Sequence, residues 1–517
     1  MGIEEHRHAI RELIEDPTLT YRQRIQALAL AAEDVLEPPP VSEACAQALA
    51  KGLICDLAEG HAPHRPRYTL PDYAKALAQG STFLELPAPT TFDDATTFLL
   101  AVYGSVPSIT GYPVWFGDLD ALLEPFAAEL TDEELRTRLR RFWVLLDRLF
   151  PDAFAHANLG PTDGRVVRAA LAVHRDVRQV VPNLTLRVDP DVTPDDLLLD
   201  AMRTVATVAQ PHLVNHPMMV ADLGDRYGVV SCYNSLPVGG GSHTLVRLNL
   251  KEAALRHAGR SSTFVRDSLP VAIELTAELM EARIRHLVER TPFFETSWLV
   301  TEGLLSLDRF TAMFGLFGLA ECVEHLLALD GRDLRYGRDE DADALAHEIV
   351  ETAARLVAER PMPYCEASGG RALLHSQAGL DSDRQVTAGT RVAVGGEPGL
   401  YRHLEAVAPN HRWFPAGVSD IVRLDETVTE NLQAAVDIAK GALAMGMRDV
   451  TFEVANGEFV RVTGYLVRRR DIDRVASGDG VRHSSSVLGA GSFTNARLDD
   501  RRPQRVRSPE RDARPRR

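Results

Sequence analysis

The chain lacks the features on which membrane and disulfide-rich proteins depend. Its 517 residues contain no stretch of about twenty apolar residues, which argues against a membrane span. The five cysteines are widely spaced and include no CxxC pair, which argues against a disulfide framework and a cysteine-rich zinc or iron-sulfur site. The N-terminus is charged and amphipathic, unlike a secretory signal. We therefore expect a cytoplasmic protein without a membrane partner or a bound metal.

Net positive charge is also absent. A formal net charge of -16 argues against a nucleic-acid partner and favours an enzyme with a small-molecule substrate. A composition of 45% hydrophobic and 25% charged residues is typical of a globular protein. Helical spacing dominates the first hundred residues, and strands, loops and capped helices alternate after them. This order predicts an α/β fold behind an N-terminal helical region.

One segment near the C-terminus, residues 451–470, reads TFEVANGEFVRVTGYLVRRR. Alternating apolar residues predict strands over 451–454 and 458–463, and the Asn456-Gly457 pair between them is typical of a hairpin turn. Gly464 follows the second strand. A glycine there can simply permit a turn. It can also be a reagent, because the flanking amide nitrogen and carbonyl stabilise an unpaired electron on Cα, and no side chain twists the radical centre.

A stored backbone radical must be relayed to an atom that can attack a substrate. A thiol suits this step, because its S–H bond is close in strength to the glycyl C–H bond and the exchange is reversible. Cys232 lies where a predicted buried strand over 227–230 opens into a glycine-rich loop over 233–241. Loops held on strand ends are where α/β folds carry chemistry. We therefore expect Cys232 to carry the thiyl.

The other cysteines have different contexts. Cys365 also lies in a loop and is the alternative thiyl residue. Cys322 falls within residues 308–329, an apolar segment that we predict to be a buried helix. Cys45 and Cys55 fall on predicted early helices. Most free cysteines are small buried apolar residues, which is the expected role of these last three.

The segment FVRVTGYLV resembles the C-terminal signature of glycyl radical enzymes, whose core reads Arg-Val-small-Gly-Tyr. Residues 182–202 and 308–327 are similar to two further segments of that superfamily. Over residues 108–470 the chain most resembles the YjjI-like glycine radical proteins. The resemblance implies a ten-stranded α/β barrel made of two five-stranded halves, with the Cys232 and Gly464 loops meeting inside. Residues 1–107 would be the helical region, and residues 471–517 a polar, partly disordered tail.

The same resemblance implies how the radical arises. A separate activase, a radical S-adenosylmethionine protein with an iron-sulfur cluster, would remove a hydrogen from Gly464. The chain itself would bind no cofactor and would carry the radical as a post-translational modification. Its substrate would be a small polar organic molecule, and a homodimer is the expected assembly.

Departures from related enzymes leave the reaction open. Ser231 and Tyr233 flank Cys232, whereas formate acetyltransferases use two adjacent cysteines. Asn234 stands where diol dehydratases carry the Glu of a Cys-x-Glu pair, and Thr463 replaces a smaller residue before the glycine. The four-cysteine zinc site of anaerobic ribonucleotide reductases is absent. Dehydration, C–C cleavage or another lyase-type rearrangement is expected. The alternatives are a ribonucleotide-reductase-like enzyme, an acyltransferase-like radical enzyme, and a non-catalytic α/β protein.

Acid/base work or substrate contact must then come from other residues. The candidates are Asn234, Glu321, Glu366 and His216. Glu321 stands out because it falls within an otherwise apolar predicted helix. The alternative for each is a surface charge or a loop hydrogen bond. His212 and His216 are four residues apart, but prolines bracket them, so we predict no helical metal site there.

Overall fold

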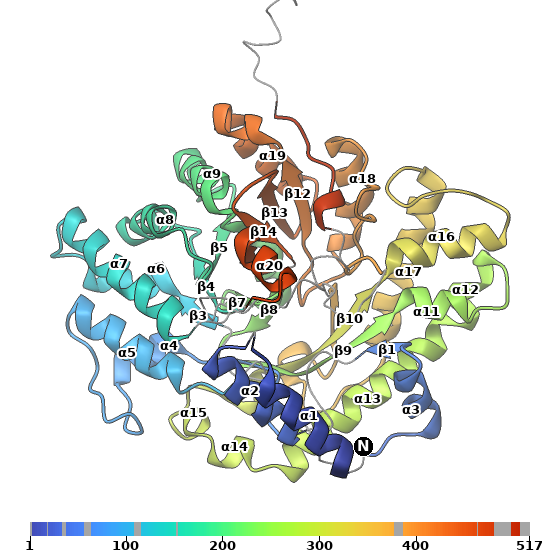
Figure 1. Cartoon of the computed structure of the whole chain (residues 1–517), viewed down its shortest axis with the longest axis horizontal. Coiled ribbons are helices and arrows are strands. Elements are labelled where there is room, and N and C mark those ends of the chain that lie inside the picture. The colour runs from blue at the N-terminus through green and yellow to red at the C-terminus, as the bar shows by residue number, and fades with distance from the viewer. Residues whose placement is uncertain are drawn as a thin grey trace, which may run out of the picture.

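The computed structural model describes residues 3–17, 19–33, 38–55, 64–107, 115–150, 154–376, 386–462, 464–479 and 498–506. Strands gather in the centre of the molecule and helices surround them (Figure 1). The predicted mixed α/β fold is confirmed. In these ranges, no helix combines the length and the apolar character needed to cross a membrane.

The larger sheet has six strands in the order β12-β13-β6-β5-β4-β3. Strands β3 to β6 run parallel to one another, and β6 is antiparallel to β13, which is parallel to β12. The strand bounds are β3 Trp115–Asp118, β4 His156–Leu159, β5 Asn183–Val188, β6 His212–Asn215, β12 Asp420–Leu424 and β13 Asp449–Val454. Almost every residue of these strands is buried, as expected for a parallel sheet covered by helices.

The second sheet has five strands, with β9 at its centre. Strands β9, β10 and β11 are parallel, and the short strands β1 and β2 pair with β9 in the antiparallel direction. The bounds are β1 Ile54–Cys55, β2 Tyr68–Leu70, β9 Gly240–Asn249, β10 Phe310–Phe317 and β11 Leu373–Ser376. The N-terminal region thus contributes two strands to this sheet, in addition to its helices.

Residues 416 and 417 link the two sheets. The Ala416 amide donates to the Leu374 carbonyl of β11, the Ser376 amide donates to the Gly417 carbonyl, and β12 begins at Asp420. Strand pairing among the described residues does not close the two sheets into one ring. The ten-stranded barrel therefore stays an expectation from the resemblance.

Helices cover the outer faces of both sheets (Figure 1). In the six-stranded half, α8 packs between α7 and α9, and α19 packs on α9; in the five-stranded half, α13 packs on β9, and α16 contacts α11 and α17. The bounds are α7 Asp132–Leu149, α8 Arg165–Val177, α9 Asp195–Val208, α11 Leu250–Leu255, α13 Leu269–Arg290, α16 Leu319–Leu329, α17 Glu340–Glu359 and α19 Leu432–Ala444.

The helix predicted over residues 308–329 is wrong. Residues 308–329 are not one helix: Phe310–Phe317 is the buried strand β10, and the helix α16 begins only at Leu319. A continuous apolar run has no periodicity that separates a buried strand from a buried helix. Gly318, at φ 77°, makes the break between the two elements.

The hairpin predicted around Asn456-Gly457 is also wrong, because the two strands that flank the turn do not pair with each other. Asn456 and Gly457 do form a turn, but β13 pairs with β12 and β6. The strand after the turn, β14 (Phe459–Arg461), pairs instead with β15 (Leu466–Arg468). The hairpin is therefore displaced along the chain, and Gly464 lies in its connection. The Val462 amide, donating to the Tyr465 carbonyl at 3.1 Å, closes that connection.

The chain returns to the six-stranded sheet after the Gly464 hairpin. Helix α20 (Arg469–Ala476) follows β15, and residues 498–506 run beside β12 with Leu498 and Val506 buried. The proposed boundary at 107/108 falls where the described range 64–107 ends, and of the terminal residues predicted to be disordered, 507–517 lie outside the described ranges. Within residues 471–517, the described parts are folded onto the domain.

A buried ion pair holds this returning segment. Arg501 Nη1 lies 2.8 Å from Glu453 Oε2, and Arg423 Nε lies 3.6 Å from the other carboxylate oxygen. The Arg501→Ala variant removes the shortest of the contacts to the buried Glu453 carboxylate and leaves the Arg423 contact at 3.6 Å and the Arg461 amide at 3.4 Å. We expect it to lower the free energy of unfolding by about 3 kcal/mol, measured by urea denaturation. The matched control is Arg502→Ala at an exposed side chain, which should change it by less than about 0.5 kcal/mol. Equal midpoints for the two variants would contradict this role for the pair.

Candidate active site

Cys232 lies at the tip of a buried hairpin. The strands β7 (Tyr227–Val230) and β8 (Asn234–Pro237) pair up to Val230 and Asn234, and residues 231–233 connect them. Residues 234–237 were predicted as loop, so this second strand is a correction. Ser231 and Tyr233 have φ values of 50° and 66°, a region that side chains other than glycine rarely adopt. Such a conformation persists only where the surroundings hold it, which points to a functional constraint.

Gly464 lies directly against this tip. A Cβ added to Gly464 would overlap the Ser231 carbonyl oxygen and the Cys232 Cα, and would lie 3.0 Å from the Ser231 carbonyl carbon. The three atoms nearest to that position all belong to Ser231 and Cys232, and none to Cys365. Gly464 and Cys232 are both buried. Only glycine lets the two main chains approach this closely.

A second glycine holds the opposite side of the tip. Gly417 has a φ of 114°, and a Cβ there would overlap the Tyr233 carbonyl oxygen and lie 3.3 Å from Asn234 Cα. The Ala416 carbonyl accepts a hydrogen bond of 2.9 Å from the Ser235 amide. The Cys232 tip is thus clamped between the Gly464 hairpin and the Gly417 segment.

An asparagine fixes the strand that leads to Cys232. The Asn158 side chain accepts from the Val229 amide and donates to the Val229 carbonyl, both at 2.8 Å, as a neighbouring strand would. The Trp115 indole N–H donates to the same Asn158 oxygen at 3.1 Å. These groups are fully buried, so each bond also avoids the cost of an unsatisfied polar atom. The six-stranded sheet thereby positions the Cys232 hairpin.

A buried tyrosine of β2, Tyr68, lies beside the Cys232 tip. The Tyr68 hydroxyl accepts a hydrogen bond of 3.5 Å from Asn234 Nδ2, and the Ser231 and Arg67 side chains are close enough to lower its pKa against the larger effect of burial. Tyr68 is 2% exposed, and burial raises the pKa of its phenol, with the neighbouring Cys232 acting in the same direction. The phenol therefore stays protonated at neutral pH. Nothing in the sequence around Tyr68 marks this role, because the contact depends on how β2 pairs with β9.

A buried polar network supports the other flank of Cys232. The Tyr233 ring meets the edge of the His212 ring with centroids 5.0 Å apart. One His212 nitrogen lies 2.6 Å from Asp449 Oδ2 and the other 2.6 Å from Thr185 Oγ1. The Arg391 guanidinium stands 5.8 Å from the Tyr233 ring centroid. Both His212 nitrogens are thus engaged, and the ring is fixed as a wall for Tyr233.

The four predicted accessory residues fall in different places. Asn234 donates to the Val230 carbonyl at 3.1 Å and lies beside Tyr68, so the structure brings it to the Cys232 tip. His216 begins α10 (His216–Leu223), and its Nδ1 lies 2.9 Å from the Tyr227 hydroxyl. Burial lowers the pKa of His216, so the imidazole is neutral at neutral pH. Residues 217–220 belong to this helix.

The two predicted carboxylates have other contacts. Glu321 lies in the first turn of α16 and accepts hydrogen bonds from the Thr387 amide and hydroxyl, at 2.8 and 2.5 Å. Glu366 is exposed in a short 3-10 turn. Among the described residues, neither has a hydrogen bond or ion pair with the Cys232 hairpin. Their proposed part in acid/base work has no geometric support.

Three other cysteines are buried in structural positions. Cys365 lies in a turn in which its carbonyl accepts from the Ser368 and Gly370 amides. Burial raises the pKa of the Cys365 and Cys322 thiols, and that of Cys45 to about 11. Cys55 lies on β1, not on the predicted helix. In the described ranges, no three His, Cys, Asp or Glu side chains group as a metal site, and His212 and His216 lie on a strand and a helix start.

The pattern that defines the family named Glycyl radical enzyme YjjI-like matches residues 19–504. The chain belongs to this family. It is similar to the Escherichia coli K12 protein named Uncharacterized protein YjjI, at 43% identity over 96% of this chain and 95% of that protein. A Haemophilus influenzae Rd protein is 36% identical over 95% of this chain and 96% of its own length.

Solved structures of glycyl radical enzymes share the fold. A Roseburia inulinivorans structure concerned with 1,2-propanediol dehydration aligns with a TM-score of 0.72 at 12% identity, covering 96% of this chain and 89% of that one. At this identity the likeness concerns the fold alone. The glycyl radical enzyme assignment accounts for the glycine–cysteine contact and excludes the non-catalytic alternative.

The clamp around the Cys232 tip predicts a specific effect in this YjjI-like protein. The Gly417→Ala variant forces a Cβ into the Tyr233 carbonyl at a left-handed φ, and should lower the free energy of unfolding by about 2 kcal/mol. Gly441→Ala is the control, since that glycine lies in α19 with nothing within 4 Å; it should be neutral or stabilise by up to about 1 kcal/mol. Urea denaturation measures both. A Gly417→Ala midpoint equal to that of the wild type would show that the segment does not clamp the tip.

Proposed function

We propose that this protein stores an unpaired electron on the Gly464 Cα and relays it to the Cys232 sulfur. The resulting thiyl takes a hydrogen atom from a carbon of a small polar organic substrate, in lyase or dehydratase-type chemistry. The observation that carries the proposal is the contact of the Gly464 backbone with the Cys232 backbone in a buried site. Family membership supports the reaction class but leaves the substrate open.

The relay is a single hydrogen transfer. The Cys232 S–H bond breaks, its hydrogen atom forms a C–H bond at the Gly464 radical, and the unpaired electron remains on sulfur. The reverse transfer restores the glycyl radical after turnover. Both steps need the two groups to be held in near-contact, which the clamp of Gly464 and Gly417 around the tip favours. Burial protects both radicals from solvent.

Tyr68 is the group best suited to proton transfer at this site. Loss of a hydroxyl group or cleavage of a C–C bond leaves an oxygen that must gain or share a proton. Among the described residues, no carboxylate hydrogen bonds to the Cys232 hairpin tip, whereas the Tyr68 phenol contacts Ser231 and lies beside Asn234. Its raised pKa keeps the proton available. We assign Tyr68 the role of proton donor, with Asn234 as a hydrogen-bonding partner of Tyr68 or substrate.

The remaining parts of the proposal follow from the radical. A separate radical S-adenosylmethionine activase with an iron-sulfur cluster would remove the Gly464 hydrogen, since this chain has no cysteine grouping for such a cluster. A reducing, oxygen-poor cytoplasm suits a thiol and a carbon radical. A homodimer is the proposed assembly.

Electron paramagnetic resonance tests the relay without a substrate. After anaerobic activation, the wild type should give a doublet, because the one hydrogen left on the Gly464 Cα splits the signal, and Gly464→Ala should give none. In D2O the doublet should collapse to a singlet, because Cys232 exchanges its S–H with solvent and passes deuterium to the glycine. Cys232→Ala should retain the doublet in D2O.

The control for the relay is Cys365→Ala, which should behave as the wild type in both solvents. If the doublet in D2O still collapses in Cys232→Ala but not in Cys365→Ala, the thiyl would be assigned to Cys365 instead of Cys232. Absence of any doublet with an activase that loads the wild-type Escherichia coli relative would refute the stored radical.

Tyr68→Phe tests the proton donor. It removes the hydroxyl and keeps the ring, so the doublet and its collapse in D2O should be unchanged. Turnover should fall by about 100-fold on the first vicinal diol or hydroxy acid that the wild type converts, measured by mass spectrometry of the product. Unchanged turnover in Tyr68→Phe would remove Tyr68 from the mechanism and leave the relay intact.

A further inference from the structure

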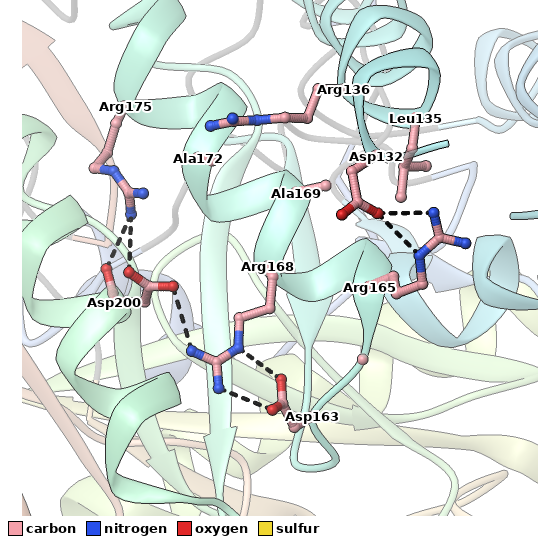
Figure 2. Close-up of a pocket in the computed structure, with 11 residues that line it drawn as sticks. Asp132, Leu135, Arg136, Asp163, Arg165, Arg168, Ala169, Ala172, Arg175 and Asp200 are labelled. Carbon is pink, nitrogen blue, oxygen red and sulfur yellow. Dashed lines mark hydrogen bonds and ion pairs between the residues drawn. The ribbon is translucent and has the colours of Figure 1, made fainter. Parts of the chain in front are cut away.

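A pocket unrelated to the radical site lies in the outer helical layer. It is bounded by α7, α8 and α9 and has a volume of about 580 Å³, within the range of small-molecule sites. Ala169 and Ala172, one turn apart on α8, line the pocket with small side chains that leave room for a ligand. Leu135 of α7 adds an apolar wall (Figure 2). The rim carries four arginines: Arg136, Arg165, Arg168 and Arg175.

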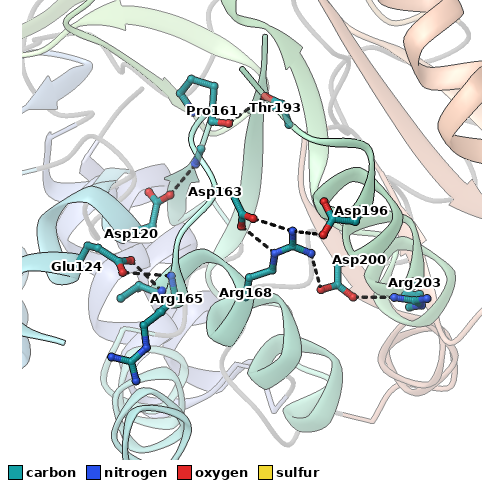
Figure 3. Close-up of polar contacts among 12 residues, drawn as sticks. Asp120, Glu124, Pro161, Asp163, Arg165, Arg168, Thr193, Asp196, Asp200 and Arg203 are labelled. Atoms are coloured by element: carbon teal, nitrogen blue, oxygen red, sulfur yellow. Dashed lines mark hydrogen bonds and ion pairs between the residues drawn. The ribbon is translucent and has the colours of Figure 1, made fainter. Parts of the chain in front are cut away.

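Two of these arginines are fully engaged within the protein. Arg165 donates to Asp132 and to the Ala127 and Leu130 carbonyls. Arg168 makes a two-bond pair with Asp163 at 2.8 Å and also reaches Asp196 and Asp200 (Figure 3). These contacts connect α8 to the loop before it and to α9, so both side chains build the pocket and are not available to a ligand.

The other two arginines keep unused donors. Arg136 is exposed and, among the described residues, has no hydrogen bond or ion pair. Arg175 uses only Nη1, for the Asp200 carbonyl at 3.2 Å and the Thr204 hydroxyl at 2.8 Å. Its closest carboxylate oxygen, on Asp200, is 4.0 Å away. In Figure 2 the Arg136 side chain extends across α8 on the side of the pocket where Arg175 lies.

Carboxylates and cations both surround these two donors. Asp200 also pairs with Arg168 at 3.3 Å and with Arg203 at 3.0 Å, so its charge is shared among three arginines. Burial lowers the pKa of Arg175; Asp200 and Asp176 offset part of this shift, while repulsion by the positive charges of Arg203 and Arg136 adds to it. An anion with two negative charges between Arg136 and Arg175 would relieve the repulsion and use the free N–H donors.

We propose that this pocket binds a small phosphorylated metabolite, with its phosphoryl group between Arg136 and Arg175 and its organic part on Ala169 and Ala172. A phosphoryl group suits the site because its oxygens accept from two guanidinium groups at once, whereas a single carboxylate balances one charge. The site is separate from the radical residues, so its occupation does not depend on activation.

Isothermal titration calorimetry on the unactivated full-length chain tests the site, at constant ionic strength balanced with chloride. Phenyl phosphate is the probe for an organic phosphate and inorganic phosphate is the probe for the free anion. We expect saturable binding of one phenyl phosphate per chain, and an affinity for inorganic phosphate that is at least tenfold lower. Equal affinity would assign the site to the free anion and overturn the metabolite proposal.

Variants locate the binding. Arg136→Gln changes an exposed side chain without a hydrogen bond or ion pair to the described residues, and should lower the affinity for phenyl phosphate at least tenfold. Arg175→Gln should lower it to the same extent. Arg140→Gln is the control, being exposed on α7 but not part of the pocket. Circular dichroism checks that each variant is folded. No saturable binding to the wild type, or wild-type affinity in Arg136→Gln, would overturn the proposal and leave the radical relay untouched.

Discussion

The contact between two main chains, at Gly464 and at the Ser231–Cys232 peptide, is the constraint on which the site depends. It leaves no room for a Cβ on the first chain, so the residue type at 464 follows from packing as well as from radical stability. Electron delocalisation and close approach both require glycine, for separate physical reasons. A substitution at this position therefore separates the two hairpins and, under the proposed mechanism, would remove the radical at the same time.

The other residues of the site hold that contact in place. Non-glycine residues on both sides of Cys232 adopt left-handed backbone conformations, which cost free energy unless the neighbours fix them. Gly417 holds one side, and Asn158 replaces a missing strand beside β7. The His212 and Asp449 network forms a rigid wall behind Tyr233. The precision needed for hydrogen transfer thus comes from both sheets and from the segment that links them.

Gly464 and Cys232 could be singled out from the sequence, because a glycine in the Arg-Val-x-Gly-Tyr context and a cysteine at a strand end each have a chemical signal of their own. The structure brings their backbones into contact, and their radical roles stay predictions. Sequence reasoning could not find Tyr68, whose role depends on the pairing of β2 with β9 over a long separation. It misread residues 310–317 as helix, because a fully buried strand carries no alternation. The Asn456-Gly457 turn was predicted, but the strand partners were not, since a turn motif gives local geometry and tertiary packing decides which strands pair.

The return of residues 498–506 to β12 affects what a break in the chain would do. Gln504 bonds the backbone on both sides of Leu424, and Arg501 is buried against Glu453. A carbon radical that meets oxygen can sever its own backbone. If Gly464 carries the proposed radical, the scission point would lie between two segments that are separately anchored in one core. The nicked protein would keep its native size and much of its shape, with the C-terminal piece retained as a non-covalent subunit. Damage of this kind would become visible as two chains only after denaturation.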